Sequence, residues 1–270
     1  MRERCRALVL AGMVLGLPAV AGGQNLECLI YPEMTVAVAS PVEGVLDKVF
    51  VDRGDLVKAN QVVANLESSV ERALLRLAQT RAEKQSALKS SQARVEFGDR
   101  RYTRTLEMFR KELVPLKEMD EAETAKVLAE FEQLEAQEEQ RLAKLEVERT
   151  RAILDLKTVR SPINGVVVER LLNGGEFAKQ APILRLAQID PLRVEAIVPV
   201  ALFGRIRVGM QAEVTPEAPV GGVWPARVTV VDRVIDAASG TFGVRLALPN
   251  PDLRLPAGLK CKLRFNLGGR

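Results

Sequence analysis

A short sequence pattern occurs twice in this chain of 270 residues, and its two copies lie 121 residues apart. The first copy, residues 40–45, reads Ser-Pro-Val-Glu-Gly-Val, and the second, residues 161–166, reads Ser-Pro-Ile-Asn-Gly-Val. Each proline fixes φ at a strand entry and each glycine permits a tight turn, so both copies are predicted to be β structure. The same offset continues downstream, where Gly54 matches Gly175. The residues expected to determine this fold are Pro41, Gly44, Gly54, Pro162, Gly165 and Gly175.

Neither copy alone is large enough to bury a core, so the two are predicted to form one quasi-symmetric β-sandwich. The segment between them, residues 68–157, holds 36 charged residues among 90, with one glycine and one proline. Ser68 and Glu71 fit a capping box at the start of a helix, and only Pro115 interrupts the helical pattern. We therefore expect an antiparallel helical hairpin with two arms of about 65 Å each, at about 1.5 Å per residue.

The two arms carry opposite charge. Residues 68–112 have a net charge of +5 and residues 117–157 have −5, which predicts attraction along the hairpin. A single solvated helix and a hairpin folded back onto a core are the alternatives, but so many charges leave little apolar face, which favours projection into solvent. Apolar residues also recur along the arms at an imperfect helical spacing: Val70, Leu74, Leu77, Val127, Phe131, Leu134, Leu142 and Leu145.

Composition limits the chemistry that this chain can perform. It contains no histidine, which removes Ser-His-Asp and Cys-His nucleophiles and histidine-ligated zinc or haem. Eleven aromatic residues are too few for base-stacking platforms, and the 39 basic residues are balanced by 35 acidic ones, so no nucleic-acid partner is expected. No cofactor and no metal site are predicted.

The first 21 residues are predicted to be a secretory signal peptide. Three arginines precede an apolar stretch, residues 7–17, and Ala19-Val20-Ala21 offers a small-x-small cleavage site. An uncleaved membrane anchor is the alternative. Cleavage would leave Cys28 and Cys261, which allow only one intramolecular pairing in an exported chain. A disulfide between them would tie the first mature strand to the last one, and two buried free thiols are the other interpretation.

The repeat and its helical insertion resemble the split lipoyl-like domain of periplasmic adaptor proteins, also called membrane fusion proteins, of the HlyD family. The resemblance continues at residues 192–199, 208–214, 240–244 and 250–259, which are similar to strands and turns of the adaptor β-barrel. It implies an α+β fold: a split lipoyl-like β-sandwich with an inserted long antiparallel α-helical hairpin, followed by a small β-barrel domain. The implied domains are a signal peptide (1–21), the N-terminal strand with the first lipoyl-like half (22–67), the hairpin (68–157), the second half (158–188) and the β-barrel (189–270).

Adaptors that dock on TolC-like channels carry an Arg-Leu-x-x-Leu…Ser…Asp pattern around the hairpin tip. Here Arg104 and Asp120 match, whereas Thr105 and Met108 replace the leucines and Pro115 replaces the serine. These departures leave open which channel the tip would contact. The candidate partner-contact residues are Arg104, Met108, Val114, Pro115 and Asp120.

The resemblance implies a non-enzymatic periplasmic adaptor that links an inner-membrane exporter, of RND or ABC type, to an outer-membrane channel. It also implies a homo-oligomer, a hexamer in the family. A stand-alone periplasmic binding or scaffold protein is the alternative. An enzyme using acidic pairs such as Asp52 with Asp55 is a further hypothesis, but 35 acidic residues make such neighbours expected by chance. A biotin or lipoyl carrier is not expected, because the turn that holds the modified lysine is replaced by the hairpin.

Overall fold

A computed structural model describes residues 25–266 of the chain, so the predicted signal peptide at residues 1–21 lies outside the described residues. The chain divides into two compact units. One unit comprises residues 34–188, and the other combines the segment ending at Glu33 with the segment from Ile189 onward. None of the helices in the described part of the chain is long and apolar enough to cross a membrane.

The unit of residues 34–188 contains the sandwich that the repeat predicted. Its four-stranded sheet has the order β5-β4-β2-β7, with bounds Thr158–Arg160, Val62–Leu66, Gly44–Val49 and Phe177–Ala178. The facing strands are β3 (Leu56–Val57) and β6 (Gly165–Arg170), which pair with each other, while β6 also pairs with β8 (Pro182–Pro199). Alternating strand residues from both halves fill one core, which includes Leu46, Val63, Leu66, Val167, Ile183 and Leu184.

The two sequence repeats interlock by reciprocal backbone hydrogen bonds. The amide of Gly54 donates to the carbonyl of Val167 at 2.8 Å, and the amide of Gly175 donates to the carbonyl of Leu46 at 2.7 Å. Each donor and each acceptor is related to its counterpart by the same 121-residue offset. Gly54 and Gly175 both have positive φ, 93° and 89°, which explains why glycine stands at both positions. Each half therefore completes the sheet of the other.

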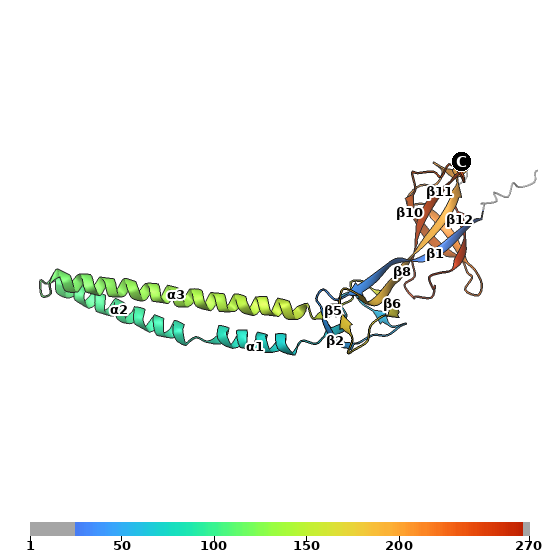
Figure 1. The fold of residues 1–270 in the computed structure, drawn as a ribbon. Helices are drawn as coiled ribbons and strands as arrows, with labels where there is room; N and C mark the ends of the chain where they lie inside the picture. The colour runs from blue at the N-terminus through green and yellow to red at the C-terminus, as the bar shows by residue number, and fades with distance from the viewer. Residues whose placement is uncertain (1–24, 267–270) are drawn as a thin grey trace, which may run out of the picture. The chain divides into compact units, whose positions relative to one another are not determined.

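Three helices form the insertion: α1 (Ser69–Glu83), α2 (Ser86–Arg110) and α3 (Leu116–Asp155). Figure 1 shows α1 and α2 following each other along one arm, with α3 beside them as the second arm. Pro115 stands at the N-cap of α3, where its fixed φ suits a helix start. The prediction that only Pro115 interrupts the helical segment was wrong, because the first arm also breaks at Lys84, whose backbone is extended.

A change of heptad phase explains this break. In α1 the less exposed positions are Leu75, Ala78 and Ala82, and the same spacing would next place Gln85, Lys89 and Gln92 against α3. The first four positions that are buried or half-buried in α2 are instead Leu88, Ser91, Val95 and Gly98. The seam is displaced by one residue, which is a rotation of about 100° in a continuous helix. Interrupting the arm restores contact between α2 and α3.

The seam between the arms is built mostly from small and polar side chains. Gly98 packs so closely that a Cβ atom there would lie 3.3 Å from the Cα atom of Lys126. Small residues let helix backbones approach without leaving large apolar side chains between them. The seam on α3 keeps a strict seven-residue period at Met119, Ala122, Lys126, Ala129, Gln133, Ala136, Gln140, Ala143, Val147 and Thr150.

The apolar residues that recur along the arms face outward. Val70, Phe131 and Leu142 are 63%, 63% and 66% exposed, and the others of that set are also exposed. Large apolar residues usually form the contact between paired helices. Here small and polar residues fill most of the contact, together with a few larger apolar residues such as Leu88 and Met119, and most large apolar residues lie on the outer faces.

The predicted capping box is also absent. Ser68 is the N-cap of α1 but makes no side-chain capping hydrogen bond. Glu71 does not reach back to it and instead forms an ion pair with Lys157, with 3.0 Å between Oε1 and Nζ. The base of the hairpin is therefore held by a bond between its first and last turns.

The other unit is a closed β-barrel. Its strands run in the order β1-β12-β9-β10-β11-β8, and a pairing of β1 with β8 closes the ring. Inward side chains such as Ile30, Val194, Leu246 and Leu263 are fully buried in one core. The bounds are β1 Leu26–Ala39, β8 Pro182–Pro199, β9 Gln211–Pro216, β10 Trp224–Val231, β11 Thr241–Leu248 and β12 Lys260–Phe265.

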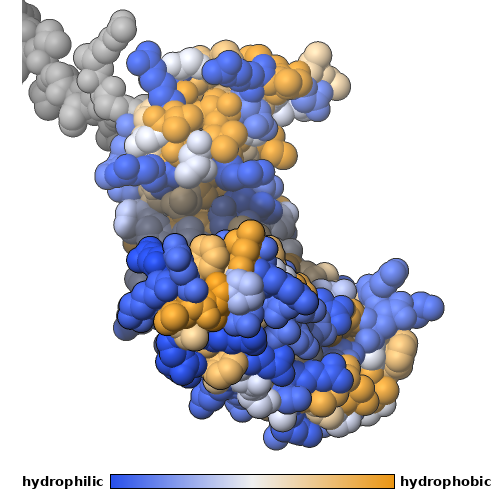
Figure 2. Space-filling view, turned by 90° about the vertical axis from the view of Figure 1, so that its left-hand side faces the viewer, coloured by the Kyte–Doolittle hydropathy of each residue, from blue (hydrophilic) through white to orange (hydrophobic). Residues whose placement is uncertain are grey.

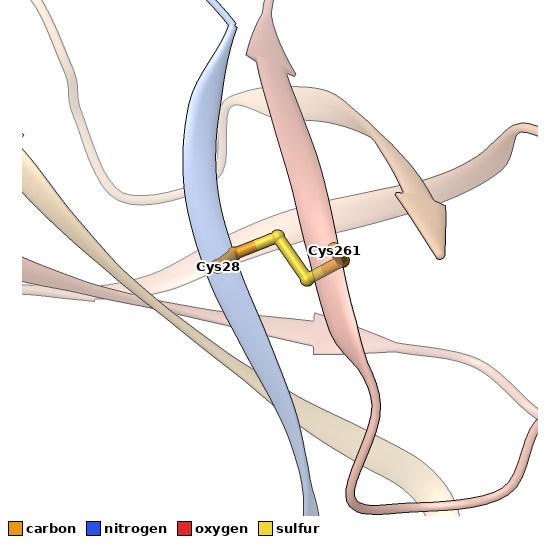
Figure 3. The surroundings of a disulfide bond; sticks show 2 residues. All are labelled: Cys28 and Cys261. Carbon is orange, nitrogen blue, oxygen red and sulfur yellow. A yellow bond between two sulfur atoms is a disulfide. The ribbon is translucent and has the colours of Figure 1, made fainter. Parts of the chain in front are cut away.

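Cys28 and Cys261 are direct partners in the register between β1 and β12. Their Cα atoms lie 4.8 Å apart and their sulfur atoms form a disulfide (Figure 3). Both side chains belong to the barrel core. The bond joins the N-terminal strand of the barrel to its C-terminal strand across 233 residues of chain.

Candidate partner-binding surfaces of the hairpin

The hairpin tip, residues 104–120, is shaped by a tight backbone turn between α2 and α3. Glu112 adopts a left-handed conformation with φ of 60°. The amide of Leu113 donates to the carbonyl of Met108 at 2.9 Å, which closes the C-terminus of α2. The amide of Glu118 then donates to the carbonyl of Pro115 at 3.1 Å as α3 begins. Backbone bonds hold the turn, so the apolar side chains around it are free to face solvent.

Four of the five predicted contact residues are exposed. Arg104, Met108, Pro115 and Asp120 are open to solvent, and Val114 is half-buried. Among the described residues neither Arg104 nor Asp120 forms an ion pair with another side chain, although Arg104 donates through Nε to the carbonyl of Arg100 at 3.2 Å. The structure thus gathers these residues at one end of the hairpin without joining them into a bonded cluster.

The end of α3 nearest the tip also carries a shallow depression that the sequence did not predict. It is lined by Leu116, Asp120, Thr124 and Leu128, which recur every four residues. Leu116 and Leu128 are 60% and 58% exposed. The i, i+4 spacing of these residues was the available signal, because it places them on one helix face. The depression extends the apolar surface of the tip along α3.

The opposite charges of the arms do not meet mainly across the seam. Arg94 pairs with Glu132 in the predicted direction, with 2.6 Å between nitrogen and oxygen. In the other two contacts between the arms the basic residue stands on α3 or just after it: Lys126 with Asp99, and Lys157 with Glu71. Most of the charged side chains that give the arms their net charges of +5 and −5 therefore face outward. Figure 2, seen from the side toward which the tip points, shows hydrophilic surface interrupted by separate apolar patches.

Two rows of exposed apolar residues follow the hairpin on its outer sides. The first, here called the α3 row, faces away from the first arm, and the second, the α1–α2 row, faces away from α3. Their members are between 40% and 63% exposed, except Leu142 at 66%. Exposed apolar side chains that recur along one side of an element are typical of interaction surfaces. The α3 row comprises Val127, Phe131, Leu134, Leu142 and Leu145, and the α1–α2 row comprises Val70, Leu74, Leu77 and Phe97.

Beside the helix break the arms separate and leave a hollow of about 510 Å³. Alanines from both arms, including Ala87 and Ala136, line it together with Arg81 and Glu139. No cluster of three or more metal-ligating side chains occurs within residues 25–266.

Comparison with known proteins agrees with this architecture. Residues 34–188 match the family model of the CzcB-like barrel-sandwich hybrid domain, and residues 191–269 match that of the CusB-like β-barrel domain. The chain therefore belongs to the membrane fusion protein family, the periplasmic adaptor subunits of efflux systems.

Individual relatives are more distant. The nickel and cobalt resistance protein CnrB of Cupriavidus metallidurans is 28% identical over 87% of this chain and 55% of its own length. The macrolide export protein MacA of Yersinia pestis is 25% identical over 86% of this chain and 64% of its own. The crystal structure of MacA from Actinobacillus actinomycetemcomitans superposes with a TM-score of 0.74 at 19% identity, covering 90% of this chain and 78% of that one. The chain spans little more than half the length of the first curated relatives it matches.

Proposed function

We propose that this chain is a non-enzymatic periplasmic adaptor that links an inner-membrane exporter to an outer-membrane channel. The observation that carries the proposal is the long helical hairpin, whose two arms leave and re-enter an interlocked sandwich at paired strands. Val62 in β4 is in register with Arg160 in β5, so both ends of the hairpin are fixed together. Its work would be mechanical, with the hairpin tip contacting the channel and the β-barrel contacting the exporter.

The outer rows of the hairpin support a homo-oligomer. They lie on opposite sides of the hairpin, so the α3 row of one copy can pack on the α1–α2 row of the next. Such a head-to-tail contact closes into a ring when the rotation between copies permits. The net charges of −5 and +5 on the same two sides are complementary in this arrangement.

The exposed tip supports contact with a channel. Met108 and Leu113 are 45% and 67% exposed although both are large apolar residues. With Arg104 and Asp120 nearby, the tip combines an apolar centre with charges of both signs, which is typical of interface cores and rims. Proline in place of the family's serine removes one hydroxyl hydrogen bond, so a channel partner would contact this tip mainly through apolar packing.

Crosslinking in intact cells tests the proposal. A photoreactive residue at Met108 is expected to capture an outer-membrane channel, and one in the β-barrel is expected to capture an inner-membrane transporter. The same residue at Ala93, exposed on α2 and away from the tip, is the control. A chain that crosslinks to no envelope protein from either position would contradict the adaptor and would favour the stand-alone binding or scaffold protein.

A further inference from the structure

One end of the β-barrel carries two loops that lie side by side. The loop of residues 200–210 follows β8, and the loop of residues 232–240 follows β10. Because β8 and β11 are antiparallel neighbours and Thr241 is in register with Pro199, both loops emerge at the same end. The amide of Val200 donates to the carbonyl of Gly240 at 2.9 Å, which joins them directly. We call this pair of loops the barrel-end loops.

The barrel-end loops expose large apolar side chains. Val234 is 85% exposed at the middle of its loop, and Val208 is 65% exposed in the other. Phe203 rests edge-on against Phe242, with ring centroids 5.3 Å apart, yet 46% of its surface remains outward. None of this apolar surface contributes to the barrel core. The exposed apolar residues are Val200, Phe203, Val208, Val234 and Ile235.

Three arginines stand among these apolar residues. Arg205, Arg207 and Arg233 are exposed, and none of them forms an ion pair with another described residue. The two carboxylates of these loops lie against nearby backbone. Asp232 lies over Gly243, where a Cβ atom would collide with its carboxylate, and Asp236 accepts a hydrogen bond from the amide of Ala238 at 2.8 Å.

The first strand of the barrel begins at the same end as the barrel-end loops. Leu26 at the start of β1 is in register with Leu263, and Phe265 near the end of β12 is in register with Ala212 at the start of β9. Since β9 begins directly after the loop of residues 200–210, β1 begins at the same end of the barrel.

We propose that the barrel-end loops bind the surface of a phospholipid bilayer that contains anionic headgroups. The exposed valine, isoleucine and phenylalanine side chains enter the interface, and the three guanidinium groups bind lipid phosphates. The inference requires no transporter, so it stands or fails separately from the proposed adaptor function.

Vesicle flotation tests the proposal with the chain of residues 22–270, which contains every described residue of both units. Vesicles of phosphatidylethanolamine with phosphatidylglycerol are expected to carry the protein upward, and vesicles of phosphatidylcholine alone are expected to carry less. Replacing Arg207 or Arg233 by glutamine should weaken binding by about fivefold each, from the contribution of one basic residue near a charged surface. The V208E/V234E double variant should weaken binding to both vesicle types by about tenfold or more, since it removes apolar surface and adds repulsion.

The matched control is Val223→Glu. Val223 is 64% exposed, nearly as much as Val208, but lies in the loop between β9 and β10 at the opposite end of the barrel. This variant should float like the wild type. Equal flotation of wild type, V208E/V234E and Val223→Glu, or no flotation of the wild type, would overturn the proposal. Loss of transporter crosslinking in V208E/V234E with no vesicle binding by the wild type would assign the loops to a protein partner and would also overturn it.

Discussion

Glu71 and Lys157 form an ion pair across the base of the helical hairpin, with 3.0 Å between their charged atoms. Their side chains are 19% and 16% exposed, so water screens the pair less than it does the other ion pairs of the hairpin. The hydrogen bond from Lys157 lowers the pKa of Glu71. The contact joins the first turn of α1 to the residue that leads into β5.

Replacing Glu71 by glutamine is expected to lower the free energy of unfolding at pH 7 by about 1–2 kcal/mol, between the values for exposed and buried pairs. Because the pKa of Glu71 is lower in the folded state, its contribution is complete above the ordinary pKa of glutamate, about 4.3, and is lost as the pH falls through the lowered value. Helix unfolding followed by circular dichroism at pH 7 and pH 3 measures this. Glu83→Gln, at the exposed end of α1, should change little, and a difference between Glu71→Gln and wild type that persists unchanged at pH 3 would contradict the assignment.

Gly98→Leu should destabilise the hairpin by about 1–3 kcal/mol, the usual cost of overpacking. A side chain there meets the backbone of Lys126, which cannot move aside as a flexible side chain could. Thermal unfolding of the helices measures the effect. Ala93→Leu, exposed on the same helix, is the control, and equal melting of both variants would show that the arms are not closely packed at Gly98.

Removing the disulfide should destabilise the β-barrel more than the hairpin. Loop-closure reasoning for a sequence separation of 233 gives about 5 kcal/mol as an upper value for the C28S/C261S variant. Trp224 is the single tryptophan and lies in the barrel, so its fluorescence follows the barrel while circular dichroism follows the helices. The fluorescence transition is expected to move to lower urea concentration. Coincident shifts of both signals would mean that the two units unfold as one.

The F131E/L134E variant should weaken self-association at least tenfold, because it places two carboxylates within the apolar α3 row, and a packed contact would have to desolvate them. Sedimentation over a range of concentrations measures the association. Gln137→Glu, exposed on the same helix but outside the row, is the control. Association that survives F131E/L134E would place the contact between copies elsewhere.

Met108→Asp should abolish export that depends on this chain while leaving the helical content unchanged. It places a carboxylate in the apolar centre of the tip, which a packed interface would have to desolvate without a partner. Growth in the presence of an exported toxic compound, together with circular dichroism, measures both effects. Ala93→Asp should export normally, and normal export by Met108→Asp would locate channel contact away from the tip.

Much of the architecture is readable from spacing alone. The 121-residue repeat predicts one sandwich made of two halves, and the structure adds that Gly54 and Gly175 bond reciprocally into the opposite half. Residues 192–199, which resemble part of the adaptor β-barrel, lie within β8 of the barrel. Gly and Pro signals of this kind are reliable because they act on the backbone locally, whatever the tertiary contacts.

The details of the hairpin were less predictable. Large apolar residues at helical spacing predict a seam, but here small and polar residues fill most of the seam and residues such as Phe131 face outward. Lys84 and Gln85 are good helix formers, so the local helix propensities do not predict the break between α1 and α2. It follows from the change of phase, which is visible only when the seam of both arms is known. The sequence around Glu71 fits a capping box, and only the tertiary structure shows that Glu71 pairs with Lys157 instead.

The strict seven-residue period of the α3 seam sets a rule for changing the reach of the hairpin. Both ends of the insertion are anchored at the paired strands β4 and β5, so its length can vary without altering the sandwich. A shortened or lengthened version keeps its packing only if whole heptads are removed or added in both arms together, each changing the reach by about 10 Å at 1.5 Å per residue. The distance that the hairpin can bridge therefore changes only in steps of one heptad.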